Sequence, residues 1–375
     1  MRETEGLERR LRAQLGQLDR AGLRRTLRAP SGLDFSSNDY LGLSQHPVLK
    51  QRMAAAVCEL GCGSTGSRLL RGERDAFSQV ERRFASFKNA ERALYFSSGY
   101  LANIAVLSTF AEAEDVIFSD ERNHASLIDG ARLSRARKVI YPHNDVTALR
   151  RLMRDDAGAG QKFVVTESLF SMDGDFAPLA EYAALCREHG AALIVDEAHA
   201  VGIYGERGSG WMEACGGEND VFVSVNTAGK ALGVAGAFVA GPEFAIETLV
   251  QRARPFVFST APPPALAAAL EASLDLIAAE PQRREQLLDR AEHLGRALGL
   301  AGTSQIIPFI LGSNERATVT ASALQERGFD VRAIRPPTVP EGSARLRISV
   351  NVNLSEDALD RFAAALNEIS CAVSS

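Results

Sequence analysis

The sequence predicts an α/β fold, with a mainly parallel seven-stranded central sheet and helices on both faces. From about Pro47 onward, short apolar runs alternate with longer amphipathic segments, as strands alternate with helices in such folds. Runs such as Phe163–Glu167 are apolar at successive positions, as expected of strands covered on two sides. The seven candidate strands are Ala93–Phe96, Val116–Phe118, Lys138–Tyr141, Phe163–Glu167, Ala192–Asp196, Val221–Val225 and Gly236–Ala240.

Three parts are expected along the 375 residues: an N-terminal arm and helix over 1–44, a large α/β domain over 45–280, and a small α+β domain over 281–375. Leucines at three- and four-residue steps between Leu7 and Leu18 predict an amphipathic helix in the arm. A long helical segment over roughly 265–295 is expected to lead into the small domain. There, the expected elements are strands at Gln305–Leu311 and Arg345–Val350 and a last helix at Ser355–Ile369.

Composition favours a soluble, cytoplasmic protein. The net charge of -5 and the isoelectric point near 5.8 disfavour nucleic acid or a membrane surface as a partner, although a local basic site for a phosphorylated ligand stays open. The five cysteines form no CxxC pair, as in proteins with reduced thiols. The charged N-terminus does not resemble a signal peptide, and the apolar stretch Ala265–Ala279 contains two acids, so no membrane span is expected.

Two glycine-bearing segments are candidates for phosphate binding. Gly61–Gly66 matches GxGxxG, but a helix-like segment precedes it and no helix follows directly, so a dinucleotide site is disfavoured. Ser97–Tyr100 lies between a strand and a helix start, where backbone amides and the helix dipole favour an anion. Tyr100 and His124 could flank a flat heteroaromatic ring there; alternatively, Tyr100 is a core aromatic and His124 caps the next helix.

Asp196-Glu197-Ala198-His199 follows the most apolar strand, and ligand sites of parallel sheets lie at strand carboxyl ends. Asp196 could equally be a helix cap. A helicase is excluded because no GxxxxGK[ST] phosphate loop occurs, and a metal is not expected because ligands with suitable spacing are missing.

Lys230 helps to distinguish a ligand site at Asp196 from a helix cap. A lone lysine is usually a solvated surface group, but Lys230 stands among small residues just past an apolar strand. Pyridoxal phosphate requires a lysine amine for its aldehyde, a carboxylate for its ring nitrogen, and donors for its phenolate and phosphate. Lys230, Asp196, His199 and Thr227 would supply these groups, so together they indicate a pyridoxal-phosphate enzyme.

The chain resembles the α-oxoamine synthase family of fold-type I pyridoxal-phosphate enzymes over nearly its whole length. The motifs that carry the resemblance are Ser37–Leu43, Ser98–Tyr100, Asn123–Ser126, Thr166–Asp175, Asp196–His199 and Thr227–Lys230. As an ordered set these motifs are highly specific.

The resemblance implies a role for each cofactor-binding residue. Lys230 would form the Schiff base and later remove the substrate α-proton, and His124 would stack on the ring. Asp196 would bind the pyridine nitrogen, and His199 with Ser171 would contact the phenolate side. The groups that would hold the phosphate are Gly99, Tyr100 and Thr227, with Ser259 and Thr260 reaching it from the other subunit of a homodimer.

The resemblance also implies the substrates. Arg347, with Asn38 nearby, would bind the amino-acid carboxylate, and Arg24 is a weaker candidate for the acyl side; without the resemblance, Arg345 and Arg347 would be a pair of strand residues on one face. The stretch Ala333–Pro340 points to the branch that condenses L-alanine with a pimeloyl thioester, carried by coenzyme A or acyl carrier protein, in biotin synthesis. Glycine C-acetyltransferase or 5-aminolevulinate synthase activity is the alternative. A non-catalytic scaffold is disfavoured because Lys230 and its partners are present.

Overall fold

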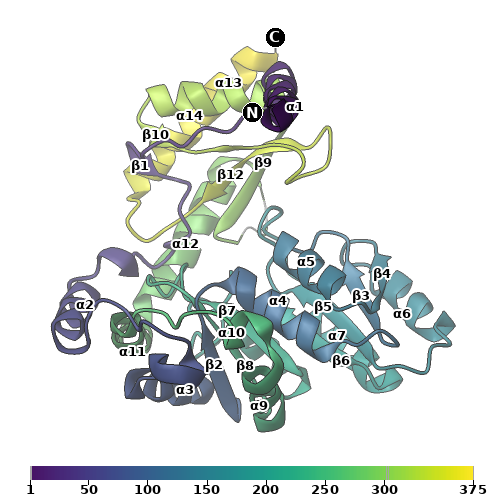
Figure 1. The fold of residues 1–375 in the computed structure, drawn as a ribbon. Coiled ribbons are helices and arrows are strands. Elements are labelled where there is room, and N and C mark those ends of the chain that lie inside the picture. Colours follow the sequence, from purple (N-terminus) through teal and green to yellow (C-terminus); the bar gives the residue numbers. More distant parts are fainter. Residues whose placement is uncertain (1, 301, 303, 375) are drawn as a thin grey trace. The chain divides into compact units, whose positions relative to one another are not determined.

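The computed structural model describes residues 2–300, 302 and 304–374, which form two compact units (Figure 1). The large unit comprises Asn38–Ser171 and Asp175–Gln286, and the small unit comprises Met1–Ser37, Met172–Gly174 and Leu287–Ser375. The three-part domain division expected from the sequence stays a prediction.

A seven-stranded sheet forms the centre of the large unit, in the order β2-β8-β7-β6-β5-β3-β4. Its strands are β2 (Arg92–Phe96), β3 (Val116–Asp120), β4 (Arg137–Tyr141), β5 (Lys162–Glu167), β6 (Ala192–Asp196), β7 (Val223–Thr227) and β8 (Ala237–Gly241). Only β8 is antiparallel, to both β2 and β7, and the other pairs are parallel. The predicted mainly parallel sheet is confirmed, although β7 begins two residues later than the predicted Val221–Val225.

Helices cover both faces of this sheet, as predicted. The helices of the large unit are α2 (Pro47–Leu60), α3 (Asp75–Phe87), α4 (Gly99–Phe110), α5 (Ala125–Leu133), α6 (Val146–Asp155), α7 (Leu179–His189), α8 (Trp211–Ala214), α9 (Glu243–Arg252), α10 (Arg254–Val257) and α11 (Pro264–Ala279). Successive residues of β5 point to opposite faces. Val165 packs with residues of α4 and α9, and Val164 packs with residues of α6 and α7. Both valines are fully buried, which explains why apolar residues occupy successive positions in the middle of this strand.

The long helical segment expected over roughly 265–295 is present but interrupted, because the chain forms two helices there. α11 ends at Ala279 and α12 (Gln282–Ala297) begins after Pro281. Proline has no backbone N–H to donate and disfavours helical geometry at the residue before it, and Glu280 indeed leaves the helix at φ -122° and ψ 56°.

The small unit combines short sheets with helices, as the predicted α+β class requires. β11 (Ala333–Ile334), β12 (Ala344–Ser349) and β9 (Ile306–Gly312) form an antiparallel sheet in that order. β1 (Leu33–Asp34) pairs in parallel with β10 (Phe329–Asp330). The helices are α1 (Arg2–Arg20), α13 (Asn314–Glu326) and α14 (Glu356–Ser374).

Aromatic packing ties the N-terminal segment into the small unit. Phe35 stacks on Phe362 of α14 with ring centroids 4.0 Å apart, and Phe329 meets both rings edge-on. Phe35 and Phe362 are fully buried. The residues that follow α1 therefore belong to the same core as the last helix of the chain.

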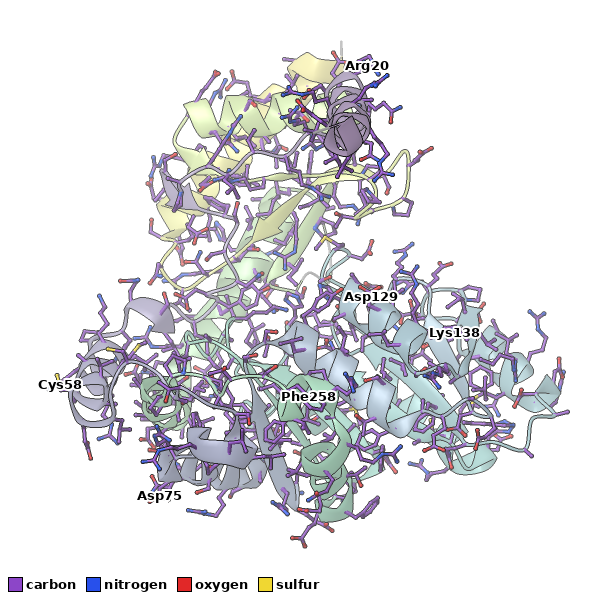
Figure 2. The ribbon with its side chains drawn as sticks, in the orientation of Figure 1. Arg20, Cys58, Asp75, Asp129, Lys138 and Phe258 are labelled. Atoms are coloured by element: carbon purple, nitrogen blue, oxygen red, sulfur yellow. The ribbon has the colours of Figure 1, made fainter. Side chains whose placement is uncertain are left out.

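The surface carries dispersed polar side chains, with Cys58 exposed on α2 (Figure 2). All five cysteines are free thiols. Within the described part of the chain, no helix combines the length and the apolar character that a membrane span needs.

Candidate active site

The carboxylate of Asp196 is fixed at the carboxyl end of β6. Asp196 is the last residue of that strand and is 5% exposed. Its Oδ1 accepts a hydrogen bond from the backbone N–H of Ala198 (2.8 Å), and its Oδ2 accepts one from Nδ2 of Asn103 (2.6 Å). Donors to both oxygens hold the carboxylate in one orientation, as a partner for a cationic ring nitrogen requires.

Asn103 extends this network to His124. The same amide nitrogen donates to Oγ of Ser126 (2.9 Å), and that hydroxyl lies 2.8 Å from Nδ1 of His124. His124 also accepts from the backbone N–H of Ser126 (3.2 Å), so it caps α5 as the structural alternative expected. A single buried asparagine therefore links the orientation of Asp196 to that of the His124 ring.

Lys230 lies in the turn after β7, with its Nζ 2.8 Å from Nε2 of His199. The other ring nitrogen, Nδ1, lies 2.7 Å from the hydroxyl of Tyr40, which donates to Oδ1 of Asn38 (2.9 Å). Because the phenolic proton goes to Asn38, Nδ1 of His199 is the donor to Tyr40, and Nε2 is left to accept from Lys230. These residues come from three separate segments of the sequence, and the fold joins them into one chain of hydrogen bonds.

Gly99 and Thr227 form a cradle at the start of α4. Gly99 is the first residue of the helix, and the hydroxyl of Ser98 caps it by accepting from Leu101 N (3.3 Å). A Cβ on Gly99 would lie 2.4 Å from Cγ2 of Thr227, so only glycine permits this approach. The Thr227 hydroxyl donates to the carbonyl of Ala198 (3.2 Å). A helix start with a close-packed hydroxyl residue fits a phosphate.

Tyr100 is 42% exposed, so the alternative that it is a core aromatic is wrong. Its hydroxyl donates to Asp129, and its ring meets that of His124 edge-on, with centroids 6.4 Å apart. The Gly61–Gly66 segment directly follows α2 rather than a strand, in line with the rejection of a dinucleotide site.

Burial shapes the electrostatics of this region. Glu167 ends β5 beside Asp196 in the register of the sheet, and desolvation together with the Asp196 charge raises the pKa of Glu167 to about 8. Desolvation lowers the pKa of His124, which favours a neutral imidazole for stacking on a ring. Ser171 is buried and its backbone N–H donates to Oε2 of Glu167 (3.3 Å).

The remaining residues predicted for the site lie in other segments of the chain. Ser259 is half-buried and Thr260 is exposed, and Thr260 pairs with Ser67 in an isolated antiparallel bridge. In the small unit, Arg347 of β12 is buried and donates to Oγ of Ser349 (2.7 Å). Arg24 is exposed and forms an ion pair with Asp19 (2.8 Å).

A family model for class I and II aminotransferases matches residues 30–366. The chain belongs to the class I and II aminotransferase family. It is 46% identical over 375 residues to 8-amino-7-oxononanoate synthase from Anaeromyxobacter dehalogenans (strain 2CP-1 / ATCC BAA-258), covering 94% of each chain.

Solved structures of this aminotransferase family share the fold. A serine palmitoyltransferase from S. paucimobilis with a bound PLP–myriocin aldimine matches with a TM-score of 0.91 and 28% identity, over 97% of each chain. The 8-amino-7-oxononanoate synthase from Francisella tularensis matches with a TM-score of 0.77 and 32% identity, over 92% of this chain and 98% of that one. The predicted fold-type I class is confirmed.

Sequence reasoning missed Asn103 and the part played by Tyr40 in this aminotransferase-family site. The signal for Asn103 was available, because it is the one amide side chain in the apolar helix Gly99–Phe110. A polar group on a buried helix needs a partner, and the partner here is Asp196. Tyr40 belongs to a motif quoted for the resemblance, but its contact with His199 spans 159 residues and leaves no local pattern.

Proposed function

We propose that this protein is a pyridoxal-phosphate-dependent C-acyltransferase that condenses L-alanine with a pimeloyl thioester and releases carbon dioxide. This is the reaction of 8-amino-7-oxononanoate synthase, a step of biotin biosynthesis. The 2.8 Å contact between Lys230 and His199, at the strand end that carries Asp196, is the observation that supports it most directly. The similarity to named 8-amino-7-oxononanoate synthases supports the substrate choice.

The large unit offers a group for each part of the cofactor. Lys230 would hold the aldehyde carbon, Asp196 the protonated ring nitrogen, and the start of α4 with Thr227 the phosphate. His124 would lie against the ring. The cofactor supplies an electron sink when bound, and the chain decides which bond is broken.

Proton transfer falls to Lys230 and His199. The Lys230 amine would take the α-proton of L-alanine, because a desolvated amine near a neutral imidazole is an effective base. His199 accepts from that amine, and Tyr40 fixes the tautomer that allows it to do so. General acid–base catalysis of this kind contributes about 10²- to 10⁴-fold to a rate.

Arg347 would bind the alanine carboxylate, for which a bidentate guanidinium is well suited. Loss of that carboxylate as carbon dioxide follows the acyl transfer in the proposed reaction. The protein is expected to act as a homodimer, with Ser259 and Thr260 reaching the phosphate of the other subunit and Arg24 on the acyl side.

The direct test supplies purified holoenzyme with carboxyl-labelled L-alanine or glycine and with acyl thioesters of several lengths, then measures labelled carbon dioxide and free thiol. Release of both with L-alanine and the pimeloyl thioester is expected. Release with glycine and an acetyl thioester, but not with the first pair, would instead assign the protein to another α-oxoamine synthase activity. No release with any pair would support a non-catalytic scaffold.

A further inference from the structure

Two buried carboxyl groups lie beside each other at the edge of the central sheet. Glu167 ends β5 and Asp196 ends β6, and the two residues are partners in the register of these parallel strands. Neighbouring strands of a sheet lie about 4.7–4.9 Å apart. The backbone N–H of Ser168 also donates to the carbonyl of Asp196 (2.9 Å), which holds the two strand ends together. Glu167 and Asp196 are 3% and 5% exposed, so water screens neither carboxyl group effectively.

Both side chains point to the same face of the sheet. Side chains along a strand alternate between the two faces. Val165 and Ile194, two residues before Glu167 and Asp196, pack in the same hydrophobic core as residues of α4. Glu167 and Asp196 therefore point toward the α4 side as well. The hydrogen bond between Asp196 and Asn103 of α4 agrees with this direction.

The two carboxyl groups differ in the donors that they receive. Asp196 accepts from the backbone of Ala198 and from the amide of Asn103, so each of its oxygens has a donor. Oε2 of Glu167 accepts from the backbone N–H of Ser171 (3.3 Å), whereas Oε1 is buried without a hydrogen-bond partner among the described residues. Donors to both oxygens stabilise the charged form of a carboxyl group. The structure therefore favours a negative charge on Asp196 over one on Glu167.

The net effect of the groups around Glu167 is in the same direction. Three elements place a titratable group near it: Asp196 of β6, His124 at the start of α5 and Lys230 after β7. Burial and the charge of Asp196 outweigh Lys230 and the backbone N–H groups, so the pKa of Glu167 rises to about 8. Asp120, at the end of β3, points to the opposite face, as Phe118 does when it packs with residues of α6 and α7.

We propose that Glu167 is held as a neutral carboxylic acid, which positions His124 and Ser171 through their backbone N–H groups and leaves the negative charge to Asp196. Two ionised carboxylates this close in a buried site repel each other strongly. A protonated carboxyl group still has an oxygen that accepts from a backbone N–H, so it keeps the positioning role. Asp196 is then the carboxylate that meets the cationic ring nitrogen of the cofactor. This inference rests on the cofactor site of the proposed function, but not on its substrates.

The test compares the full-length wild type with Glu167→Gln, Glu167→Leu and the control Glu213→Gln, each with and without pyridoxal phosphate. Glutamine copies the shape and the acceptor of a neutral acid, whereas leucine removes the acceptor. Burial alone would raise the pKa of Glu213, but the backbone N–H groups of Arg207 and Ser209 (2.9 Å each) lower it. Infrared difference spectra measure the carbonyl band of a protonated acid, and absorbance titration measures the affinity for pyridoxal phosphate.

At about pH 6 the wild type should show a carboxylic-acid band that Glu167→Gln lacks and Glu213→Gln keeps. The band should fade as the pH rises through about 8. Cofactor affinity should stay within about twofold of the wild type in Glu167→Gln. It should fall by about tenfold or more in Glu167→Leu, because the backbones of His124 and Ser171 lose their acceptor.

Either of two results would overturn the proposal. If the wild type and Glu167→Gln have equal spectra in the carboxylic-acid region, Glu167 is ionised. If Glu167→Gln loses as much cofactor affinity as Glu167→Leu, the site requires a negative charge at this position. The infrared comparison needs no turnover and does not depend on the leucine variant. Absent condensation in a protein that shows the band would therefore count against the proposed function alone.

Discussion

The hydroxyl of Tyr40 lies 2.7 Å from Nδ1 of His199, and this contact leaves Nε2 of His199 to accept from Lys230. The tyrosine hydroxyl contacts Asn38 and His199, and through these contacts it sets the protonation of the group that faces the lysine. Tyr40 is fully buried, so water does not replace its hydroxyl. Tyr40 is thus a positioning residue for the proposed base.

Tyr40→Phe should lower kcat by about tenfold or more while KM for L-alanine changes little, because His199 loses the partner that fixes its tautomer. The pH–rate profile should shift as well. The control is Tyr95→Phe, since Tyr95 is equally buried and donates to the carbonyl of Ala235 (2.7 Å) away from the site. Both variants should lose about 1 kcal/mol of stability, and a kcat loss shared equally by both would contradict the positioning role.

Asn103→Leu should weaken the affinity for pyridoxal phosphate by about tenfold. Oδ2 of Asp196 loses its amide donor, so that the carboxylate is held less firmly, by the contact of Oδ1 with Ala198. Absorbance titration of the apoenzyme measures this affinity. Asn123→Leu is a matched control, because Asn123 is also a buried asparagine but donates to Ser119 and to the carbonyl of Val165. Equal cofactor affinity in the two variants would show that the Asn103–Asp196 bond has no role in binding.

Gly99→Ala should reduce cofactor affinity and stability together, because the new methyl group would lie 2.4 Å from Cγ2 of Thr227. Thr227→Ser deletes that methyl group and keeps the hydroxyl. The double variant Gly99→Ala/Thr227→Ser should therefore recover most of the loss, which overpacking puts at about 1–3 kcal/mol. Unfolding experiments on the two single variants and the double variant measure the coupling, and purely additive losses would argue against this contact.

His143 should make the stability depend on pH. Burial by itself would lower its pKa, but the hydrogen bonds that its ring nitrogens donate to Asp120 and Asp175 outweigh burial and raise the pKa to about 9. The folded protein then binds the proton more tightly than the unfolded chain, whose histidine titrates near 6.5. The stabilisation is complete below about pH 6.5 and is lost as the pH rises through about 9.

The measurement is the free energy of unfolding from pH 6 to 10 for the wild type and for His143→Gln. The difference between them should shrink by about 2 kcal/mol across this range, after allowance for the half-exposed carboxylate of Asp175. Comparing the two proteins cancels the titration of Glu167, whose raised pKa also makes the stability fall as the pH rises. A difference that stays constant with pH would show that His143 is neutral in the folded protein.

The sequence was sufficient for the sheet and for the central residues of the site, because both leave local signals. An apolar run that stops at Asp196 predicts a strand end, and a lysine among small residues after the next strand predicts an unusual amine. Local signals could not predict the order of the strands, which depends on how distant runs pair. They also could not predict the Asn103–Asp196 bond, which joins residues 93 positions apart.

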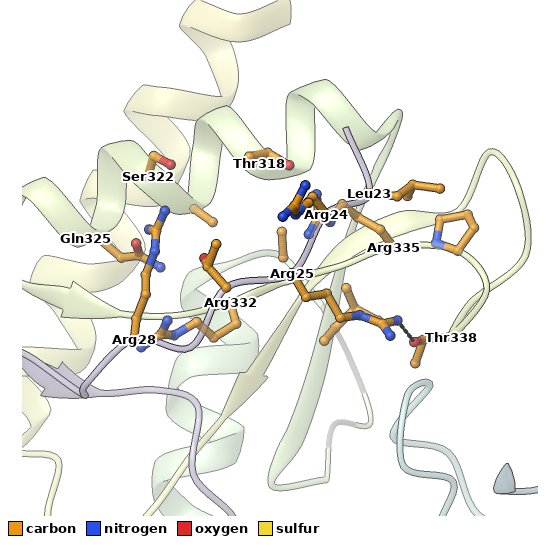
Figure 3. A pocket seen from close by; sticks show the side chains of 15 residues that line it. Leu23, Arg24, Arg25, Arg28, Thr318, Ser322, Gln325, Arg332, Arg335 and Thr338 are labelled. Atoms are coloured by element: carbon orange, nitrogen blue, oxygen red, sulfur yellow. Dashed lines mark hydrogen bonds between the residues drawn. The ribbon is translucent and has the colours of Figure 1, made fainter. Parts of the chain in front are cut away.

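Two features of the structure were not predicted from the sequence: the break between α11 and α12, and the meeting of two distant segments in the small unit. The break between α11 and α12 has a local signal in Pro281, because proline disfavours helical geometry at the residue before it. Arg28 and Arg332 line the same hollow of the small unit although they lie in distant segments of the sequence (Figure 3). The pairing of β1 with β10, and the aromatic core beside them, join these two segments.

The most direct test of the central claim is reduction of the holoenzyme with borohydride, followed by mass spectrometry of its peptides. The chain offers a clear choice, because it has five lysines: Lys50, Lys88, Lys138, Lys162 and Lys230. With one equivalent of pyridoxal phosphate, we expect a phosphopyridoxyl group on Lys230 in the wild type and on no lysine in Lys230→Ala. The same label on another lysine, or an unlabelled Lys230 in a holoenzyme that catalyses the condensation, would contradict it.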